Sequence, residues 1–452
     1  MELTFGYGKG EQIVEVPDRN LLGVLTANEM EHERRGEDAV VYALAHPIGA
    51  LRLGESVKAA RKAWRETDIR EKKEWQALHG GAFGRRILDG PDMRYKPFSI
   101  AIIASDISRP APSWEILPPI VRELLDAGCA PEEITVVFAL GSHRGHTDEE
   151  RRHLAGDWVF ETVRCEDSDP SDCIHLGETK NGTPVDITRR VAEADYVICT
   201  GNIEFHYFAG YSGGYKAIMP GVSTPAAIQA NHRMMIRDEA HAGAIDTNPI
   251  RMDIEEAGRL CGADYMVNVV LDEHKHIVYA VAGDMIEAHR AGCAYLDRMY
   301  RKPIKQQADI VLVSQGGAPK DANLYQVQKA LDNSKHAVRE GGRIILIGAC
   351  NEGFGSKVFE EWLTGADSPE SLIKRINEHF VLGGHKAAAI AMVMAKAGID
   401  LVSEMDEETV RGIFMTPRRS AAEALAAAFA DYGPDATVIA MPFGGATLPM
   451  PE

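Results

Sequence analysis

Apolar runs rich in β-branched residues alternate with segments of helical spacing along most of this chain. Such alternation is typical of parallel α/β sheets, because two parallel strands need a crossover connection that is usually a helix. The runs predicted as strands are 98–104, 134–140, 196–199, 308–313, 343–347 and 437–441. The segments predicted as helices are 116–127, 148–155, 225–235, 324–339, 370–379, 386–397 and 420–432.

Two segments depart from this alternation. Residues 3–16 alternate loosely between apolar and polar positions and carry three glycines, which predicts short strands joined by turns. The polar, charged stretch 65–75 is predicted to be helical, and a loop is predicted over 88–97. Neither segment fits the strand–loop–helix pattern that dominates the chain.

The length of the chain and the order of its elements indicate two domains. A chain of 452 residues exceeds the size at which one hydrophobic core stops growing. A second series of strands and helices begins near Pro303. We therefore predict an α/β protein of two domains, each with a largely parallel sheet flanked by helices. The domains are expected at 1–302 and 303–436, with the last strand, in 437–452, packing back on the first.

The charge balance narrows the classes of partner. The chain has 49 lysine and arginine residues against 67 aspartate and glutamate residues, a formal net charge of −18 at pH 7. Nucleic acids and anionic membranes are bound by basic surfaces, so we expect neither as a partner. The first residues lack the basic and apolar regions of a signal peptide, and no apolar run is long enough for a membrane helix. We therefore expect a cytoplasmic protein.

The cysteines do not indicate a disulfide framework or a thiolate metal site. There are seven of them, an odd number, and none forms a Cys-x-x-Cys pair. Candidate chemistry is better sought in the loops after the predicted strands, where parallel α/β proteins place their ligands.

The first such loop, 105–112, has the sequence SDISRPAP. An arginine directly after a buried strand can hold a carboxylate or a phosphate through two parallel hydrogen bonds, which makes Arg109 a candidate binding residue. Asp106 and Ser108 have side chains that cap helices, and capping the next helix is the commoner use of such residues. Both interpretations stay open at this point.

The second loop, 141–147, has the sequence GSHRGHT. His143 lies just past a predicted strand and can act as a general base near neutral pH. His143 and His146 can also be interpreted as zinc ligands, but no HExxH pattern and no convincing third ligand accompany them. A single loop histidine is more often a polar residue without a catalytic role, so this loop alone does not show whether His143 is functional.

The third loop, 201–221, is richer: GNIEFHYFAGYSGGYKAIMPG. Glycines around Lys216 let the backbone approach a bulky ligand closely, and the amides of such a loop can cradle a phosphate. The glycine order differs from the phosphate-binding GxxxxGK[ST] motif. Lys216 is a candidate covalent anchor, and its aromatic and apolar neighbours argue against a solvated lysine on a flexible loop.

Taken together, these loops resemble the nickel-pincer lactate racemases and their 2-hydroxy-acid racemase and epimerase relatives. The resemblance covers nearly the whole chain, and the loop at 204–221 is its most specific part. The matching segments are FGYGKG, SDISRPAPS, ALGSHRGHTDEE, EFHYFAGYSGGYKAIMPG, the following Asn-His pair, GGAPKDANLYQVQKAL and GGATLP.

The resemblance implies a nickel-pincer nucleotide, a pyridinium mononucleotide whose thioacid groups hold Ni(II). By this resemblance Lys216 bonds covalently to the cofactor, and His232 supplies the remaining nickel ligand. A neutral imidazole beside soft sulfur donors suits a square-planar Ni(II) ion. The other residues implied to contact the cofactor are Asp106, Ser212, Gly213 and Gly214.

The resemblance also implies roles toward a substrate, with the active site in the cleft between the domains. His143 and His206 would be two opposed acid/base groups, since inversion between mirror-image substrates needs a base on either face. One would take the hydroxyl proton while hydride leaves C2 for the pyridinium ring, and the other would return a proton after reduction from the opposite face. The implied substrate contacts are Arg109, Tyr325, Gln326, Lys329 and His146.

Two departures from the lactate-specific pattern favour a substrate larger or more polar than lactate, such as a sugar acid or a hydroxy diacid. Gly145-His146 replaces a shorter loop with proline, and the stretch 65–97 is longer. Lactate racemase proper is one alternative. A non-catalytic carrier of the nickel cofactor is another, although a carrier would not need the two acid/base histidines or the Gln326–Lys329 pair.

Two further classes fit less well. A nicotinamide dehydrogenase would show GxGxxG after its first strand, with an acidic residue about 20 positions on, and that motif is absent. A Schiff-base enzyme using Lys216 alone would leave His232 and the histidine pair unexplained. The expected partners are a small 2-hydroxy acid and, transiently, the proteins that make and insert the cofactor. A host lacking those proteins would yield apo-protein.

Overall fold

The structure, a computed structural model, describes residues 1–66, 98–381 and 383–451. The chain folds into two compact units. The central unit comprises residues 30–296, and the terminal unit combines residues 1–29 with 297–452. The predicted loop at 88–97, and all but the first two residues of the predicted helix at 65–75, lie outside the described residues.

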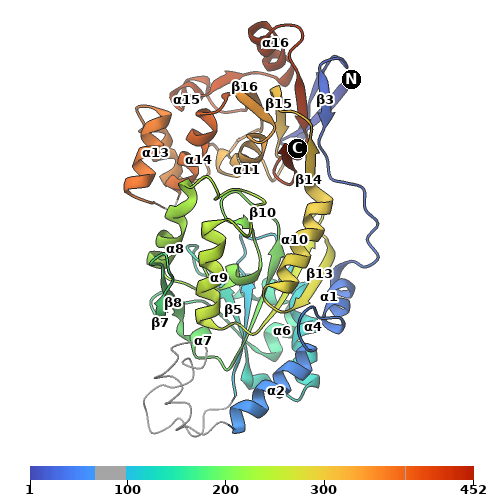
Figure 1. The fold of residues 1–452 in the computed structure, drawn as a ribbon, viewed down its shortest axis with the longest axis vertical. Helices are drawn as coiled ribbons and strands as arrows, with labels where there is room; N and C mark the ends of the chain where they lie inside the picture. The colour runs from blue at the N-terminus through green and yellow to red at the C-terminus, as the bar shows by residue number, and fades with distance from the viewer. Residues whose placement is uncertain (67–97, 382, 452) are drawn as a thin grey trace. The chain divides into compact units, whose positions relative to one another are not determined.

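The central unit is built on a six-stranded sheet with the order β13-β12-β9-β4-β5-β6, in which only β12 and β13 are antiparallel (Figure 1). From β4 the chain adds β5 and β6 on one side and later β9 and β12 on the other. The loops after β4 and β9 therefore diverge at a topological switch point, where such sheets bind ligands. The strands are β4 (Ile100–Ser105), β5 (Ile134–Ala139), β6 (Arg164–Asp167), β9 (Tyr196–Ile203), β12 (Tyr265–Leu271) and β13 (Ile277–Gly283).

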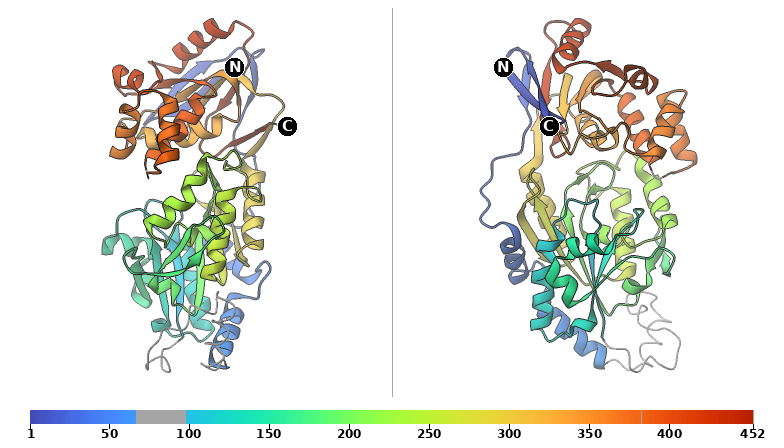
Figure 2. Two further views of the ribbon diagram at one scale, coloured as in Figure 1. Left: turned by 60° about the vertical axis from the view of Figure 1, so that its left-hand side comes forward. Right: turned by 180° about the vertical axis from the view of Figure 1, so that it is seen from behind.

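Helices cover both faces of this sheet, with α1 and α4 on one side and α8 and α9 on the other (Figures 1 and 2). Helix α5 starts at a capping box, because the Thr147 hydroxyl accepts from the Glu150 amide and the Glu150 carboxylate accepts from the Thr147 amide. The helices are α1 (Gly36–Ala45), α2 (Leu53–Glu66), α4 (Ser113–Asp126), α5 (Asp148–Ala155), α6 (Asp157–Thr162), α7 (Arg189–Ala192), α8 (Pro225–His232), α9 (Pro249–Cys261) and α10 (Glu287–Tyr300). The smaller elements are β7 (Cys173–Glu178), β8 (Pro184–Thr188), β10 (Phe205–His206), β11 (Gly210–Tyr211), η3 (Pro131–Glu133), η4 (Gly214–Ala217) and η5 (Arg233–Ile236).

The terminal unit has a six-stranded, all-parallel sheet with the order β18-β17-β16-β15-β19-β3. Alternate residues of β15 face two separate cores: Val311 and Val313 pack with α11 to α14, whereas Ile310 and Leu312 pack with the N-terminal hairpin and α16. The strands are β1 (Glu2–Tyr7), β2 (Gly10–Glu15), β3 (Leu21–Val24), β14 (Arg301–Ile304), β15 (Ala308–Ser314), β16 (Val338–Ile347), β17 (Gly398–Val402), β18 (Thr416–Arg418), β19 (Val438–Met441) and β20 (Leu448–Pro451). The helices are α11 (Leu324–Ser334), α12 (Lys357–Thr364), α13 (Pro369–Glu378), α14 (Gly384–Met394), α15 (Glu407–Gly412) and α16 (Ala421–Tyr432).

The predicted α/β class, with a largely parallel sheet in each of two domains, is confirmed. The division of the chain differs from the predicted one. Residues 1–29 belong to the terminal unit because β3 extends its sheet beside β19, and β19 itself lies inside that sheet. The segment 324–339 was predicted as one helix, but α11 ends at Ser334 and β16 begins at Val338, which pairs with Ala308. In the described part of the chain, no helix is long and apolar enough to cross a membrane.

Candidate active site

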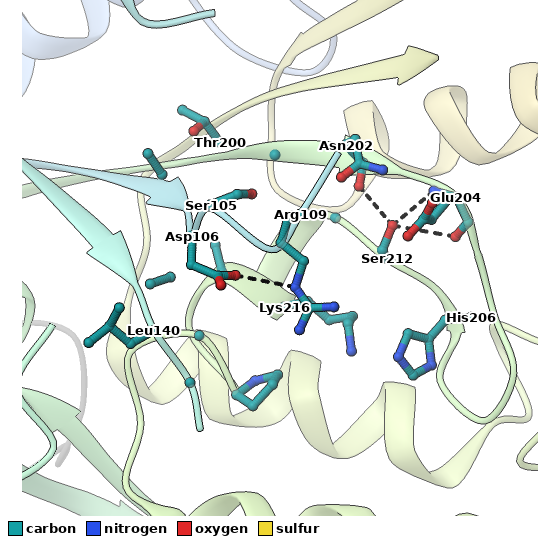
Figure 3. A pocket seen from close by; sticks show the side chains of 18 residues that line it. Ser105, Asp106, Arg109, Leu140, Thr200, Asn202, Glu204, His206, Ser212 and Lys216 are labelled. Carbon is teal, nitrogen blue, oxygen red and sulfur yellow. Dashed lines mark hydrogen bonds and ion pairs between the residues drawn. The ribbon is translucent and has the colours of Figure 1, made fainter. Parts of the chain in front are cut away.

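A pocket with a volume of about 110 Å³ lies at the C-terminal ends of β4, β5 and β9 (Figure 3). All of its lining residues belong to the central unit. Figure 3 shows the nitrogen-bearing ends of Arg109, Lys216 and His206 turned toward the same space. Residues from two separate loops, Arg109 after β4 and His206 and Lys216 after β9, therefore meet in one pocket, as expected at the switch point of the sheet.

Asp106 organises the side chains on the β4 and β5 side of the pocket. One carboxylate oxygen lies 2.8 Å from Nδ1 of His143 and also accepts from the Ser108 amide, while the other lies 3.4 Å from Nε of Arg109. Burial alone would raise the pKa of Asp106, but the hydrogen bond from His143 and the charge of Arg109 outweigh burial and lower this pKa to about 2. Asp106 is therefore an anion that orients the His143 ring.

The alternative in which Asp106 and Ser108 cap the next helix is wrong. Helix α4 begins only at Ser113, with Pro112 at its N-cap and no side-chain cap. The Asp106 carboxylate is used within its own loop and by His143. His143 does not itself line the pocket. It reaches the pocket through Asp106, and its side chain is 38 % exposed.

Lys216 lies on η4, immediately after the glycine-rich turn, and lines the pocket. Burial, and after it the positive charges of Arg109 and Arg251, lower the pKa of Lys216 to about 7, against an opposing effect of Glu204. At neutral pH a large fraction of this amine is uncharged, which is the form that attacks an electrophile.

The pKa of Lys216 predicts how the apo-protein reacts with acylating reagents. Because only the neutral amine attacks, the labelling rate at Lys216 should be low at pH 5 and rise with a midpoint near pH 7. Peptide mass spectrometry after brief treatment with an N-hydroxysuccinimide ester measures this rate. Lys374, which is 78 % exposed, is the internal control, since ordinary lysines gain reactivity only toward pH 10. Identical pH profiles for the two lysines would contradict the prediction.

A buried clamp holds the turn before Lys216. The Asn268 side chain accepts from the Gly214 amide at 2.7 Å, and His289 lies 2.8 Å from the Ser212 carbonyl. The guanidinium of Arg251 donates to the Gly213 carbonyl at 3.2 Å and lies 3.0 Å from His289. Ser212 also fixes the turn. Its hydroxyl donates to the Asn202 carbonyl at 2.7 Å and accepts from the Glu204 amide at 2.8 Å.

The backbone conformation of the turn and the close packing of this clamp explain why positions 213 and 214 are both glycine. Gly213 and Gly214 have φ values of 76° and 60°, in the left-handed region that favours glycine. A Cβ on Gly213 would lie 2.6 Å from Oδ1 of Asn268, and a Cβ on Gly214 would lie 2.9 Å from both Arg251 and His289. Gly213 lines the pocket, whereas Gly214 is enclosed by the clamp.

We predict that Gly214→Ala lowers the free energy of unfolding by at least about 1 kcal/mol, because it adds both left-handed strain and a clash. Chemical denaturation of the apo-protein measures this loss. Gly412→Ala is the matched control, since a Cβ there would meet nothing within 4 Å and the backbone is not left-handed. Equal stability of the two variants would show that the clamp is not rigid.

His206 lies on β10 and lines the pocket. Its Nδ1 accepts from the amide of Ala209 at 3.2 Å, so a neutral ring carries its proton on Nε2. The ring stacks on Tyr207 and meets the edge of Phe208. A fixed, aromatic-supported imidazole in the pocket has the placement that proton transfer needs.

His232, at the end of α8, belongs to the same aromatic cluster. Its ring centroid lies 4.8 Å from that of Phe208, which also contacts His206. Nδ1 of His232 lies 3.0 Å from the side-chain oxygen of Asn231, and Asn231 is fixed in turn by Asp253 at 2.8 Å. An imidazole that donates Nδ1–H presents the Nε2 lone pair, and such an outer hydrogen bond is typical of metal-ligating histidines. The described residues contain no group of three or more His, Cys, Asp or Glu side chains that could hold a metal ion.

The structure corrects the prediction that His146 contacts a substrate. Its side chain is fully buried, Nδ1 lies 2.7 Å from Asp167, and Nε2 accepts from the Ile107 amide at 3.0 Å. Both ring nitrogens are therefore used inside the protein. The zinc interpretation of His143 and His146 fails for the same reason, since the two rings bond different carboxylates.

Tyr325, Gln326 and Lys329 lie on α11 of the terminal unit. Gln326 and Lys329 are exposed and lie three positions apart, on one face of the helix. The Tyr325 carbonyl accepts from the Lys386 ammonium at 2.7 Å, and this ammonium lies 3.9 Å above the Tyr325 ring. These contacts fix the first turn of α11, where Asn323 is the N-cap.

Sequence reasoning missed the residues that support the site from a distance. These residues are Asp167, Arg251, Asn268 and His289, none of which lies in a loop that the sequence singles out. The available signal was a polar residue inside an apolar pattern, such as Asn268 within the run YMVNVVL, because a buried polar side chain needs a specific partner.

Comparison with known proteins agrees with the two-unit α/β fold and assigns the chain to a family of enzymes. The lactate racemase N-terminal domain family matches residues 7–64 and 92–243, and the lactate racemase C-terminal domain family matches residues 304–448. The chain belongs to the lactate racemase family, as the resemblance predicted. It is an isomerase.

Relatives and solved structures extend this result. A lactate racemase of Thermoanaerobacterium thermosaccharolyticum is 29 % identical over 97 % of this chain and 96 % of its own length. A lactate racemase of Lactiplantibacillus plantarum is 33 % identical over 76 % of this chain and 84 % of its own length. The lactate racemase apoprotein from T. thermosaccharolyticum superposes with a TM-score of 0.84, 28 % identity and complete coverage of both chains. A protein from Thermotoga maritima, 17 % identical with a TM-score of 0.58 over 85 % of this chain and 98 % of its own, shares the fold.

Proposed function

We propose that this isomerase inverts C2 of a 2-hydroxy acid, with His143 and His206 as its two acid/base groups. One observation carries the proposal: the Lys216 amine shares a pocket with Arg109 and His206, and Asp106, which also lines this pocket, bonds His143. A site for inversion needs a place to anchor a cofactor, a cation for the carboxylate and two bases. This pocket and its rim supply all three.

The chain's own residues have distinct tasks in this proposal. Arg109 binds an anionic group of the ligand, in the manner of guanidinium–carboxylate pairs. His143, which donates Nδ1–H to the ionised Asp106, accepts the hydroxyl proton at Nε2. His206 transfers a proton on Nε2 for the opposite enantiomer. Tyr325, Gln326 and Lys329 of the terminal unit are proposed to bind the substrate carboxylate.

The residues present fit the nickel-pincer nucleotide that the resemblance implies. Lys216, whose pKa is lowered to about 7, is a nucleophile for covalent attachment, and His232 is oriented by Asn231 to present Nε2 to a metal. Gly213 gives the pocket wall a surface without a side chain, while Ser212 and Asp106 also line the pocket. When bound, this cofactor supplies a pyridinium ring that accepts and returns the C2 hydrogen as hydride. We further propose that cofactor-loading proteins act on this pocket in the cytoplasm.

The proposed substrate class is a 2-hydroxy acid. A sugar acid or hydroxy diacid was favoured over lactate partly because of His146, and that argument fails now that His146 is known to be buried. The other argument, the long 65–97 stretch, falls almost wholly outside the described residues. Lactate and the larger acids are therefore compared directly in the test.

A substrate panel with chiral analysis tests the proposal. Enzyme produced together with the cofactor pathway is incubated with single enantiomers of lactate, malate, tartrate and sugar acids. We expect the opposite C2 configuration to accumulate from at least one of them, and apo-protein to be inactive. A loaded enzyme that leaves every member of the panel unchanged would favour the alternative of a non-catalytic cofactor carrier.

A further inference from the structure

His146 connects three segments at the edge of the pocket. It lies between β5 and α5, and its fully buried ring meets the edge of Phe138 at a centroid distance of 5.6 Å. On one side it contacts Asp167 at the end of β6, and on the other it contacts Ile107 in the loop after β4. A buried histidine with a partner at each nitrogen has a fixed orientation.

The partners of His146 also fix its tautomer. The ionised Asp167 carboxylate can only accept, so Nδ1 carries a proton and donates to it at 2.7 Å. The Ile107 amide can only donate, so Nε2 must be unprotonated to accept it at 3.0 Å. The same Asp167 carboxylate accepts from the His146 amide at 2.8 Å and from Arg151 at 3.1 Å. The ring is therefore neutral, with its proton on Nδ1.

The residue that His146 holds is adjacent to Asp106. Ile107 directly follows Asp106. Because the Ile107 side chain is exposed and does not pack in the core, the hydrogen bond from its backbone amide to His146 holds this part of the loop in place. Asp106 in turn bonds Nδ1 of His143 and lies 3.4 Å from Arg109. A continuous path of hydrogen bonds and one peptide link thus runs from Asp167 to His143.

We propose that His146 is a positioning residue, which anchors the Asp106 turn through the Ile107 amide and thereby keeps Asp106 on His143. This inference rests on the proposed function, in which His143 is an acid/base group. The charged groups that face His146 are Asp167 from β6 and Arg151 and Glu150 from α5. His143 faces Asp106, which also pairs with Arg109.

The test compares two substitutions at position 146 in the cofactor-loaded enzyme. His146→Leu removes the acceptor for Ile107, whereas the side-chain carbonyl of His146→Gln can still accept that amide. An anionic carboxylate stabilises the protonated form of a neighbouring imidazole, so movement of Asp106 away from His143 should shift the pH dependence of the reaction. We expect His146→Leu to lower kcat about tenfold and to move the acidic limb of the pH–kcat profile down by about one pH unit. His146→Gln should restore the position of that limb.

His153→Leu, at an exposed histidine on the following helix α5, is the control. A role limited to stability would reduce the amount of active enzyme without moving the pH limb, so an unmoved limb in His146→Leu would overturn the proposal. Selective ¹⁵N-histidine NMR of the apo-protein gives a second readout that needs no activity. We expect the His146 ring to be protonated on Nδ1 and unprotonated on Nε2. The opposite tautomer would also overturn the proposal. A wild-type enzyme inactive on all 2-hydroxy acids would instead contradict the proposed function.

Discussion

Replacement of Lys216 by alanine is expected to abolish both covalent cofactor attachment and racemase activity. Lys216 is the amine in the pocket whose pKa is lowered, to about 7, and its turn is clamped by the Arg251, His289 and Asn268 side chains. Without the nucleophile no covalent bond forms. We predict that intact-protein mass spectrometry shows no adduct on Lys216→Ala and that activity falls by at least about 10⁶-fold, below detection.

The exposed Lys374 provides the control for this experiment. Lys374→Ala, produced in the same host, should carry the adduct and full activity. The mass increase due to the adduct should be absent from wild-type protein made without the cofactor pathway. An adduct retained on Lys216→Ala would assign the attachment to another residue and would contradict the anchor role.

Alanine substitutions at His143 and His206 have the second-largest expected effect. Each should lower kcat by about 10²–10⁴-fold, the usual contribution of a general acid or base. Because inversion in either direction uses one group as base and the other as acid, both variants should lose both directions of the reaction. The cofactor adduct on Lys216 should remain in both, since neither histidine holds the η4 turn.

The retained adduct separates a catalytic loss from a loading defect. Intact mass, measured on the same samples as the rate, provides this check. His175→Ala, at a histidine whose side chain is 57 % exposed and bonded to Asp186, is the matched control and should have normal activity. Near-normal racemisation by a loaded His143→Ala or His206→Ala enzyme would contradict the two-base mechanism.

The sequence predicted the elements of the fold better than their connections. Buried strands such as β4 and β5 were recognisable because they are apolar runs rich in β-branched residues, within a few residues of glycine or proline. The assignment of residues 1–29 was not recognisable, because β3 joins β19 across more than 400 residues and no local pattern encodes that pairing. The end of α11 was misplaced because residues 335–337 keep helical spacing while Val338 already pairs with Ala308.

In the candidate site, too, the residues in loops after strands could be predicted from the sequence, whereas their long-range partners could not. Lys216 and Arg109 were found because they lie in loops after predicted strands, and His206 was found through the family resemblance. The sheet topology brings these loops together. The surroundings of His146 and His289 could not be read from local sequence. Asp167 and Arg251, which fix these two rings, lie 21 and 38 residues away along the chain. A histidine in a loop and a histidine in a helix look alike until their partners are known.

The central claim is that this chain inverts C2 of a 2-hydroxy acid by moving the C2 hydrogen as hydride. The measurement that tests it most directly is racemisation in D₂O by the cofactor-loaded enzyme, followed by chiral separation and mass spectrometry of each enantiomer. Hydride that leaves and returns without mixing with solvent leaves the product enantiomer with protium at C2. We predict that result. Deuterium at C2 of the product would show exchange through a carbanion and would contradict the claim.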